Sequence, residues 1–296
     1  MNAISTQGLG KRYRGRWALR NCAVNVPAGS VVGLVGANGA GKSTLLHLIV
    51  GLLEPTEGSI SVLGGRPGAG PDQLGRVGFL AQDAPVYATF SVGDHLRLGE
   101  RCNPSWDRAF ATRRIAELGL AHGQRAGSLS GGQRSQLALT LAMAKRPELL
   151  LLDEPVSSLD PLARREFLSD LMELVAEQGP TVALSSHLLS DVERVCDHLI
   201  VLAAGRVQLE GAVDDVLATH KVLTGPRLDS YSLPGTQTLV QESHTGRQTT
   251  MLVRTVEPIL DPRWLVTPIG LEDLVLAYMS TATTQPEACR LREVPS

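Results

Sequence analysis

A glycine-rich loop placed directly after a short apolar run constrains this chain more than any other feature. Residues 31–35 are apolar without interruption except for one glycine, as in a strand that is buried on both faces of a parallel sheet. Gly36 to Thr44 then follows the pattern G-x-x-x-x-G-K-[ST], and the apolar segment Leu45 to Leu53 has the character of a helix. This order of strand, loop and helix predicts an α/β protein with a phosphate-binding loop.

The side chains of this loop suit a nucleotide better than they suit an ordinary glycine-rich turn. Its glycines let backbone N–H groups turn toward one point, and the start of the following helix adds positive potential there. Lys42 can reach the β- and γ-phosphates, and the Ser43 hydroxyl can ligate Mg²⁺. The loop residues expected at the nucleotide are Gly36, Asn38, Gly39, Gly41, Lys42, Ser43 and Thr44.

A second apolar run, Leu149 to Leu152, ends in two carboxylates. Asp153 stands at the carboxyl-terminal edge of this expected strand, where it would hold Mg²⁺ directly or through water. Glu154 is placed to polarise an attacking water, a general-base role worth about 10²–10⁴-fold in rate. A solvated acidic turn is the alternative, but an acidic pair that ends a strand in a chain with a phosphate-binding loop favours catalysis.

The first 222 residues are expected to form one α/β domain, because apolar strand-like runs alternate with helical segments there. Further strands are predicted over residues 181–185 and 199–202, and a turn at 203–206 leads into another strand. Residues from about 90 to 147 contain few β-branched side chains and several helical segments. They predict a helical subdomain inserted into the α/β core.

Residues 223–296 predict a small accessory unit of mixed α and β structure. Residues 238–242 and 248–256 form two expected strands around a turn, and the chain beyond Thr281 is expected to be loose. One amphipathic helix is predicted from the spacing of Leu271, Leu274, Val275 and Tyr278. Because the functional motifs all precede Gly205, removal of residues 226–296 is expected to leave a folded, nucleotide-binding domain.

Composition and charge exclude several classes of protein. The formal net charge is −2 and aromatic residues make up 4% of the chain, so no nucleic-acid partner is expected. No apolar run approaches the roughly 18 residues that a membrane-spanning helix needs. The chain is therefore not expected to cross a membrane by itself, although it can dock onto a protein that does.

The pentapeptide Leu129–Gln133 (L-S-G-G-Q) lies just before a helix expected over Ser135 to Lys145. Ser130 resembles a helix N-cap, and the paired glycines permit close approach of the backbone to a ligand. In combination with the glycine-rich loop and the acidic strand end, this pentapeptide resembles the signature of the ATP-binding-cassette (ABC) ATPase family. The resemblance covers residues 1 to about 220 and implies a P-loop ATPase that uses ATP and Mg²⁺.

The resemblance implies roles for residues outside the three main motifs. Gln82 matches the glutamine of the family's Q-loop, which joins the metal ligands, and Asp160 belongs to its D-loop. His187 matches the switch histidine, which contacts the γ-phosphate. Tyr13 matches the aromatic residue that stacks on adenine, although Trp17 lies close enough in sequence to compete.

The family pattern also implies that two copies of the cassette work together. Two cassettes pair head to tail, so the signature of one copy would cover the phosphates held by the other. These signature residues are Ser130, Gly131, Gly132 and Gln133. A homodimer with two-fold symmetry would have two equivalent sites, which ATP closes and hydrolysis opens. Ala37 and Ser158 depart from the residues frequent at their places in the family, but neither change removes a phosphate or metal ligand.

The leading hypothesis is an ATPase subunit on the cytoplasmic face of the cell membrane that powers separate transmembrane permease subunits. Gln82 and residues 83–93, with the helical subdomain, would grip a cytoplasmic helix of the permease. Residues 267–279 resemble the C-terminal segment of drug- and antibiotic-exporter cassettes, which favours export. An importer subunit and a soluble ABC ATPase without a transport role are the alternatives, whereas a P-loop kinase or GTPase does not account for residues 129–133.

Overall fold

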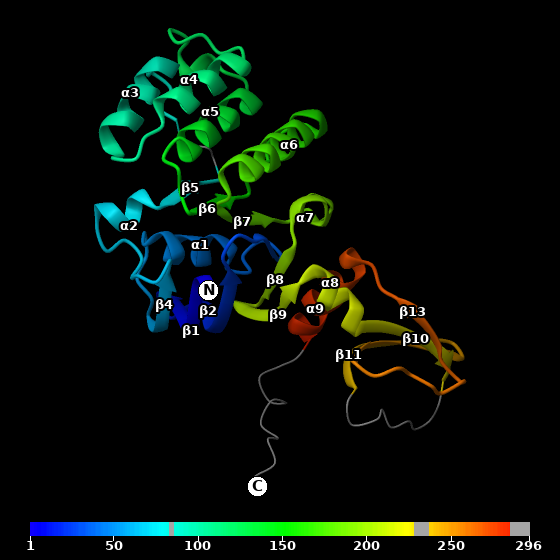
Figure 1. Cartoon of the computed structure of the whole chain (residues 1–296). Coiled ribbons are helices and arrows are strands. Elements are labelled where there is room, and N and C mark those ends of the chain that lie inside the picture. Colours follow the sequence, from blue (N-terminus) through cyan, green and yellow to red (C-terminus); the bar gives the residue numbers. More distant parts are fainter. Residues whose placement is uncertain (83–85, 228–236, 285–296) are drawn as a thin grey trace.

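The strands that the structure describes form three sheets, of which the central one is mainly parallel (Figure 1). The computed structural model describes residues 1–82, 86–227 and 237–284. The central sheet has the order β5-β6-β7-β3-β8-β9, and all its neighbouring strands run parallel except β8 and β9. Its strands are β3 (Val31–Val35), β5 (Val77–Leu80), β6 (Leu149–Asp153), β7 (Thr181–Ser186), β8 (His198–Ala203) and β9 (Arg206–Ala212). The four strands predicted from apolar runs and the turn into β9 are confirmed.

A second, antiparallel sheet has the order β2-β1-β4, with β1 at Asn2–Tyr13, β2 at Arg16–Pro27 and β4 at Glu57–Val62. Helix α1 (Lys42–Val50) packs between this sheet and the central one, and its leucines share one core with both. Strands β1 and β2 were not predicted, because buried and exposed positions alternate along them and leave no continuous apolar run.

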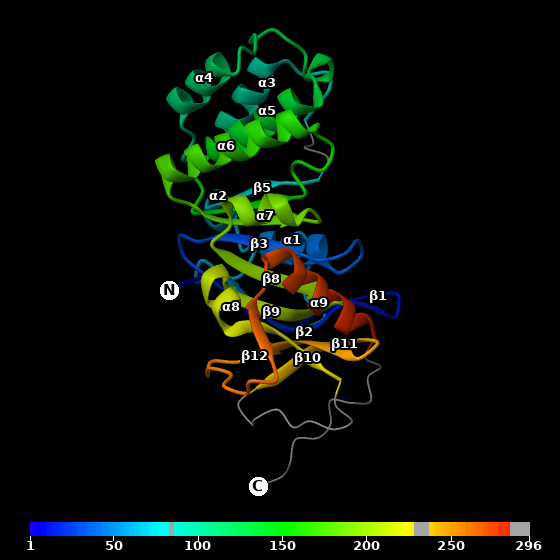
Figure 2. The same ribbon diagram turned by 90° about the vertical axis from the view of Figure 1, so that its right-hand side faces the viewer.

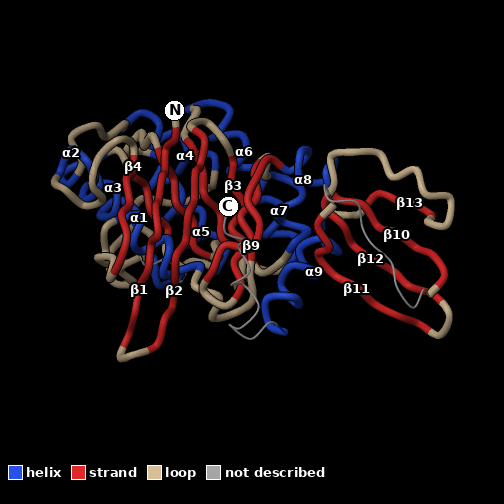
Figure 3. The backbone as a smooth tube through the Cα atoms, turned by 90° about the horizontal axis from the view of Figure 1, so that it is seen from below, coloured by secondary structure: helices blue, strands red, loops and turns tan. Residues whose placement is uncertain are grey.

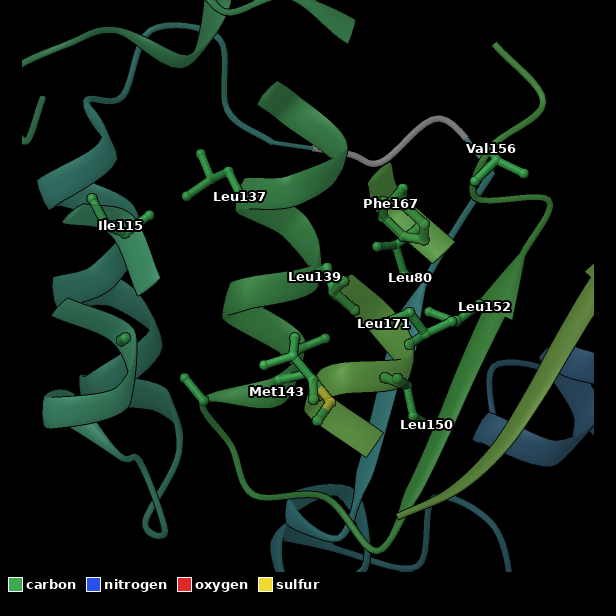
Figure 4. Packing of buried hydrophobic residues seen from close by; sticks show 14 of the residues in the cluster. Leu80, Ile115, Leu137, Leu139, Met143, Leu150, Leu152, Val156, Phe167 and Leu171 are labelled. Atoms are coloured by element: carbon green, nitrogen blue, oxygen red, sulfur yellow. The ribbon is translucent and has the colours of Figure 1, made fainter. Parts of the chain in front are cut away.

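The central sheet is buried on both faces, as the side chains of β6 show. Leu149 and Leu151 point into the core that contains α1, whereas Leu150 and Leu152 belong to a second core on the opposite face. In that second core Leu150 and Leu152 lie near Phe167 and other apolar residues of the covering helices (Figure 4). An unbroken leucine strand therefore fits the middle of a two-sided parallel sheet.

Helices gather beyond one face of the central sheet (Figure 1). They are α3 (Val92–Cys102), α4 (Arg108–Glu117), the short 3₁₀ helix η1 (Ala126–Ser128), α5 (Gly131–Met143) and α6 (Pro161–Gln178). The helix predicted over residues 135–145 begins four residues earlier, at Gly131, because Ser130 caps it. The short helix α2 (Pro71–Gly75) precedes β5. Within the described part of the chain, no helix is both long and apolar enough to span a bilayer.

The C-terminal unit is an antiparallel sheet of order β11-β12-β10-β13. Its elements are β10 (His220–Pro226), β11 (Thr238–Thr245), β12 (Gln248–Arg254), β13 (Leu265–Pro268) and helix α9 (Leu271–Thr284). The predicted hairpin and the predicted helix are confirmed. Helix α9 continues through Thr281, where a loose chain was expected, and residues 285–296 lie outside the described residues. Strand β10 begins at His220, so it crosses the domain boundary expected after residue 222.

Helix α9 packs on the central sheet rather than on its own sheet alone (Figure 2). Leu274 and Val275 are fully buried in one cluster with Val35 of β3, Val201 of β8 and Val192 of α7 (Leu189–Val195). Helix α8 (Val213–Thr219) leads from β9 into β10 and adds to the same cluster. Removal of residues 226–296 would therefore strip apolar cover from the central sheet. The expectation that this removal leaves a folded, nucleotide-binding domain stays a prediction, and the packing of α9 argues against it.

Candidate functional site

One cavity of about 520 Å³ collects most of the residues that the sequence motifs indicated. It lies where β3, β6 and β7 end, because the loops that follow parallel strands emerge at the same edge of the sheet. Its lining residues are Ala18, Asn38, Gly39, Gly41, Lys42, Ser43, Thr44, Gln82, Glu154, Ser157 and His187. The structure thus brings together residues that are up to 169 positions apart in the sequence, from Ala18 to His187.

The loop before α1 requires glycine at two positions for steric reasons. A Cβ atom on Gly36 would lie 2.3 Å from the carbonyl oxygen of Leu202. Gly41 has a left-handed backbone conformation with φ of 109°, and a Cβ atom there would lie 2.6 Å from Leu19. The loop backbone therefore lies too close to β8 and β2 for a side chain at either position.

Lys42, Glu154 and His187 form the charged centre of the cavity. The Lys42 Nζ atom lies 3.2 Å from Glu154 Oε1, and both side chains are buried, with exposed fractions of 5% and 11%. Lys42 also donates a hydrogen bond to the Gly36 carbonyl at 2.8 Å. His187 Nδ1 lies 3.1 Å from the other carboxylate oxygen of Glu154. Glu154 itself has a left-handed backbone with φ of 46°, a costly conformation for this residue type that is found mainly at functional sites.

Asp153 does not line the cavity, because its side chain is almost fully buried at the end of β6. The Ser185 hydroxyl donates to Asp153 Oδ1 at 2.7 Å and accepts a hydrogen bond from the Glu154 backbone N–H at 2.8 Å. Ser185 therefore fixes both acidic residues to β7. Sequence reasoning missed this role, since a serine inside a strand carries no motif of its own.

The signature residues lie in a separate place. Ser130 caps α5 by accepting a hydrogen bond from the Gln133 backbone, and the Gln133 side chain accepts one from the Ser130 backbone. Ser130, Gly132 and Gln133 line another cavity of about 370 Å³, which shares no lining residue with the first among the described residues. Gly131 lies between them in the first turn of α5. The structure does not bring the signature to the phosphate-binding loop of the same chain.

Three other predicted residues, Gly36, Tyr13 and Asp160, are not among those that line the main cavity. Tyr13 does not line it, because β1 carries the ring beyond the cavity to an exposed position, where Lys11 Nζ lies 5.4 Å from the ring centroid. Trp17, the competing aromatic residue, does not line it either. Asp160 caps α6 by accepting hydrogen bonds from Leu162 and Ala163. Ala18 and Ser157 line the cavity although no sequence pattern singled them out as ligands.

The donor atoms around the cavity suit a hard divalent cation. Ser43 and Gln82 line the cavity with a hydroxyl and an amide, and Asp153 supplies a carboxylate at the strand end beside it. Magnesium prefers such oxygen ligands and usually shares them with phosphate oxygens. Among the described residues, no group of three or more His, Cys, Asp or Glu side chains could hold a metal ion. The protein residues therefore fit a magnesium ion that arrives with a nucleotide.

A further cavity, of about 690 Å³, lies between the C-terminal sheet and α9. Thr250, Ser243 and Thr267 contribute hydroxyl groups to its lining, Leu252 contributes apolar surface, and Asp273 contributes a carboxylate. Within the part of the chain that the structure describes, no lysine, arginine or histidine lines it. Its lining therefore offers no cationic side chain to a phosphate.

A parallel sheet with a glycine-rich loop, a buried lysine and an acidic strand end defines a P-loop nucleotide-binding protein. Residues 19–157 match the ABC transporter family model. The Nod factor export ATP-binding protein I of Rhizobium johnstonii is 36% identical over 71% of this chain and 69% of its own. The thiamine import ATP-binding protein ThiQ of a Jannaschia species is 36% identical over 67% of this chain and 88% of its own.

The fold agrees with these relatives. A solved dimeric structure of a bacterial ABC transporter cassette superimposes with a TM-score of 0.63 at 25% identity, over 71% of this chain and 98% of that one. The chain belongs to the ABC transporter family, as an ATP-binding subunit that hydrolyses ATP. The relatives include an exporter and an importer, so family membership leaves the direction of transport open.

Proposed function

We propose that the chain is the ATPase subunit of an exporter whose transmembrane subunits are separate chains, and that it acts as a homodimer. One observation carries the proposal. Lys42, Glu154 and His187 meet in one cavity, whereas the signature residues line another that shares no described residue with the first. A second copy is therefore needed to bring a signature to the phosphates that the first copy holds.

The geometry supports a different role for each of the charged residues in the cavity. Lys42 and the backbone N–H groups of residues 36–44 would bind the β- and γ-phosphates. Glu154 would accept the proton of the attacking water, and His187 would contact the γ-phosphate from the end of β7. The contact between His187 and Glu154 already holds the two side chains on the same side of the cavity.

Magnesium fits this proposal through Ser43, Gln82 and Asp153. When bound, the ion would offset the negative charge that develops on the transferred phosphoryl group. Ser43 and Gln82 would hold their oxygen atoms toward the phosphates from two sides of the cavity. Ser185 would keep the Asp153 carboxylate in place through its 2.7 Å hydrogen bond.

We favour export because residues 267–279 resemble the C-terminal segment of exporter cassettes, and a Nod factor export protein is among the relatives. The chain would then lie at the cytoplasmic face of the membrane, held there by its permease. The segment expected to grip the permease begins at Gln82, but residues 83–85 lie outside the described residues. An importer subunit is the second candidate, supported by the thiamine import relative.

The shared-site mechanism is tested by the oligomeric state of Glu154→Gln. This variant keeps Lys42 and Asp153, so it should bind Mg-ATP without hydrolysing it and stay closed as a dimer on size-exclusion chromatography. The double variant Glu154→Gln with Ser130→Arg should remain monomeric, because the added side chain obstructs the opposing γ-phosphate. A Glu154→Gln protein that binds ATP and remains monomeric contradicts dimerisation by the isolated subunit.

The direction of transport requires the permease. Affinity purification of the full chain from its own cell membranes should recover a transmembrane protein, and Glu154→Gln should increase its yield with ATP. Reconstitution of the complex in vesicles with the ATP site outside would then show the direction. Substrate that accumulates in the vesicle lumen supports export, and ATP-driven loss of preloaded substrate supports import.

A further inference from the structure

The hairpin that joins β1 to β2 carries an unusual concentration of positive charge. Residues 11–17 read K-R-Y-R-G-R-W, which gives four basic and two aromatic side chains in seven positions, and we name this segment the cationic hairpin. The chain as a whole has a formal net charge of −2, so the overall balance conceals this local excess. Figure 3 shows that the tip of the hairpin projects beyond the rest of the molecule.

The guanidinium groups of this segment are available to a partner. Arg12, Arg14 and Arg16 are exposed, and none of them forms an ion pair with a carboxylate of the described residues. The Arg12 guanidinium donates a hydrogen bond to the Gly15 carbonyl, inside the hairpin. The nearby Glu54 pairs with Arg66 instead, at 2.7 Å. The hairpin therefore presents uncompensated positive charge to its surroundings.

Each face of the hairpin carries one arginine paired with one aromatic ring across the strands. Arg12 pairs with Trp17 across the strands, and Tyr13 pairs with Arg16, so each face holds one guanidinium beside one ring. The Arg12 guanidinium lies 5.6 Å from the Trp17 ring centroid. Aromatic rings settle at the level of lipid headgroups, and basic side chains bind the phosphates there. Both faces of the hairpin thus have the composition of a membrane-interface contact.

The turn at the tip keeps an arginine where the backbone disfavours one. Arg14 and Gly15 both have positive φ, at 43° and 89°. A two-residue hairpin turn of this kind favours Asn-Gly, because few side chains adopt a left-handed backbone without strain. The arginine places a charge at the turn of the hairpin at a conformational cost, which is expected where the charge itself is used.

We propose that the cationic hairpin binds anionic phospholipid headgroups on the membrane surface. The choice of a membrane over another polyanion rests on the proposed function, which places the chain beside a permease. The negative surface of a membrane attracts each nearby basic residue strongly enough to change partitioning about five-fold. Loss of the three exposed arginines should therefore weaken binding roughly 100-fold.

The test uses the full chain and sedimentation with vesicles of equal parts phosphatidylcholine and phosphatidylglycerol. The wild type should bind these vesicles, dissociate from them in high salt, and fail to bind pure phosphatidylcholine. The triple variant R12Q/R14Q/R16Q should lose roughly 100-fold in partitioning. A wild type that does not bind the anionic vesicles overturns the proposal, as does a triple variant that binds them as well as the wild type does.

A matched control removes the same charge elsewhere. Arg101, Arg125 and Arg165 are also exposed and form no ion pair within the described residues. The variant R101Q/R125Q/R165Q should keep vesicle binding within a few-fold of the wild type, since these arginines lie outside the hairpin. An equal loss in this variant means that net charge alone is responsible and overturns the assignment to the hairpin.

Two further measurements distinguish membrane binding from nucleic-acid binding and from a defect in the ATP site. A single-stranded RNA that binds the wild type more tightly than the vesicles, and loses binding in R12Q/R14Q/R16Q, would replace the membrane with nucleic acid and overturn the proposal. Binding of a fluorescent ATP analogue and ATP hydrolysis are measured on the same preparations. The wild type and the two triple variants should bind and hydrolyse ATP equally well. A wild type that does neither would contradict the proposed ATPase function, whatever the result with the vesicles.

Discussion

The central sheet and the C-terminal sheet both pack against helices, but only the central sheet presents a site for phosphate among the described residues. Its parallel strands β3, β6 and β7 all end at one edge, so the loops that carry Lys42, Glu154 and His187 meet there. Neighbouring strands of the C-terminal sheet run in opposite directions, and their ends are divided between two edges. The direction of the strands, more than the size of a cavity, decides where catalytic side chains gather.

The two regions nevertheless share a hydrophobic core. Helix α9 comes from the C-terminal unit, but Leu274 belongs to the same buried cluster as Val35, which directly precedes the phosphate-binding loop. Val192 of α7, the helix that follows His187, belongs to this cluster too. The chemistry therefore belongs to the central sheet, whereas the stability of that sheet depends on both regions. Substitutions in each region should separate these two contributions.

The largest effect is expected for Glu154→Gln, measured as the rate of ATP hydrolysis. The amide cannot accept a proton from water, so the rate should fall about 10²–10⁴-fold, equivalent to about 3–5 kcal/mol in the barrier. Glu242→Gln on β11 removes the same charge from the C-terminal sheet and should hydrolyse ATP at the wild-type rate. Hydrolysis by Glu154→Gln at that rate would assign the proton transfer to another group.

The next largest effect is expected for Leu274→Ala, measured as the free energy of unfolding in denaturant. Leu274 is fully buried between α9 and the central sheet, so its truncation should cost about 2–5 kcal/mol. Leu276→Ala is the matched control on the same helix, because that side chain is 50% exposed and should cost much less. Similar losses in the two variants would mean that α9 does not support the core as the structure indicates.

Lys42→Ala should weaken ATP binding by the value of one charge-assisted contact, about 1.5–3 kcal/mol. A fluorescent ATP analogue measures this loss at equilibrium. Lys221→Ala, on β10 of the C-terminal sheet, removes a lysine that lies away from the cavity and should bind the analogue normally. Unchanged affinity in Lys42→Ala would remove this lysine from the site.

The smallest effect is expected from the pair of buried His220 and half-buried Tyr278. His220 Nε2 lies 2.8 Å from the Tyr278 hydroxyl, so Tyr278→Phe should cost about 0.5–1.5 kcal/mol in unfolding free energy. Thr238→Val changes an exposed residue and is the control. If it lowers the unfolding free energy as much as Tyr278→Phe does, the hydrogen bond between His220 and Tyr278 has no specific stabilising role. Circular dichroism in denaturant measures both variants.

The same pair predicts a pH dependence. Burial lowers the pKa of His220, although its hydrogen bond to the Val216 carbonyl opposes the shift. Below the ordinary histidine pKa of about 6.5 the unfolded chain therefore binds more protons than the folded one. The contribution of His220 to the unfolding free energy should be fully present above that pH and should decrease as the pH drops below it. His220→Gln should reduce this slope, whereas an unchanged slope would assign it to other groups.

The sequence predicted the middle of the fold better than its edges. Strands β3, β6, β7 and β8 are buried on both faces, so each is a nearly continuous apolar run that can be recognised alone. In β1 and β2 only alternate residues are buried, and the pattern is weak without knowledge of the neighbouring sheet. The position of α9 also depends on tertiary packing, because its apolar stripe does not reveal which surface it covers.

The site was predictable where short motifs fix a local geometry. Lys42 and Glu154 were found because each belongs to a strand and loop of recognisable sequence. Ser185 and Ala18 were not found, since they contribute from other strands and have no pattern that distinguishes them from structural residues. Residue identity predicted which side chains meet in the cavity, whereas the supporting contacts required the structure.

The ion pair between Lys42 and Glu154 has a consequence for the timing of catalysis. Each of these side chains serves as the counter-ion of the other, at 3.2 Å. A triphosphate offers Lys42 a more highly charged partner, and exchange of counter-ions would release the carboxylate toward water. Binding of the triphosphate would thereby free the carboxylate that we propose as the base.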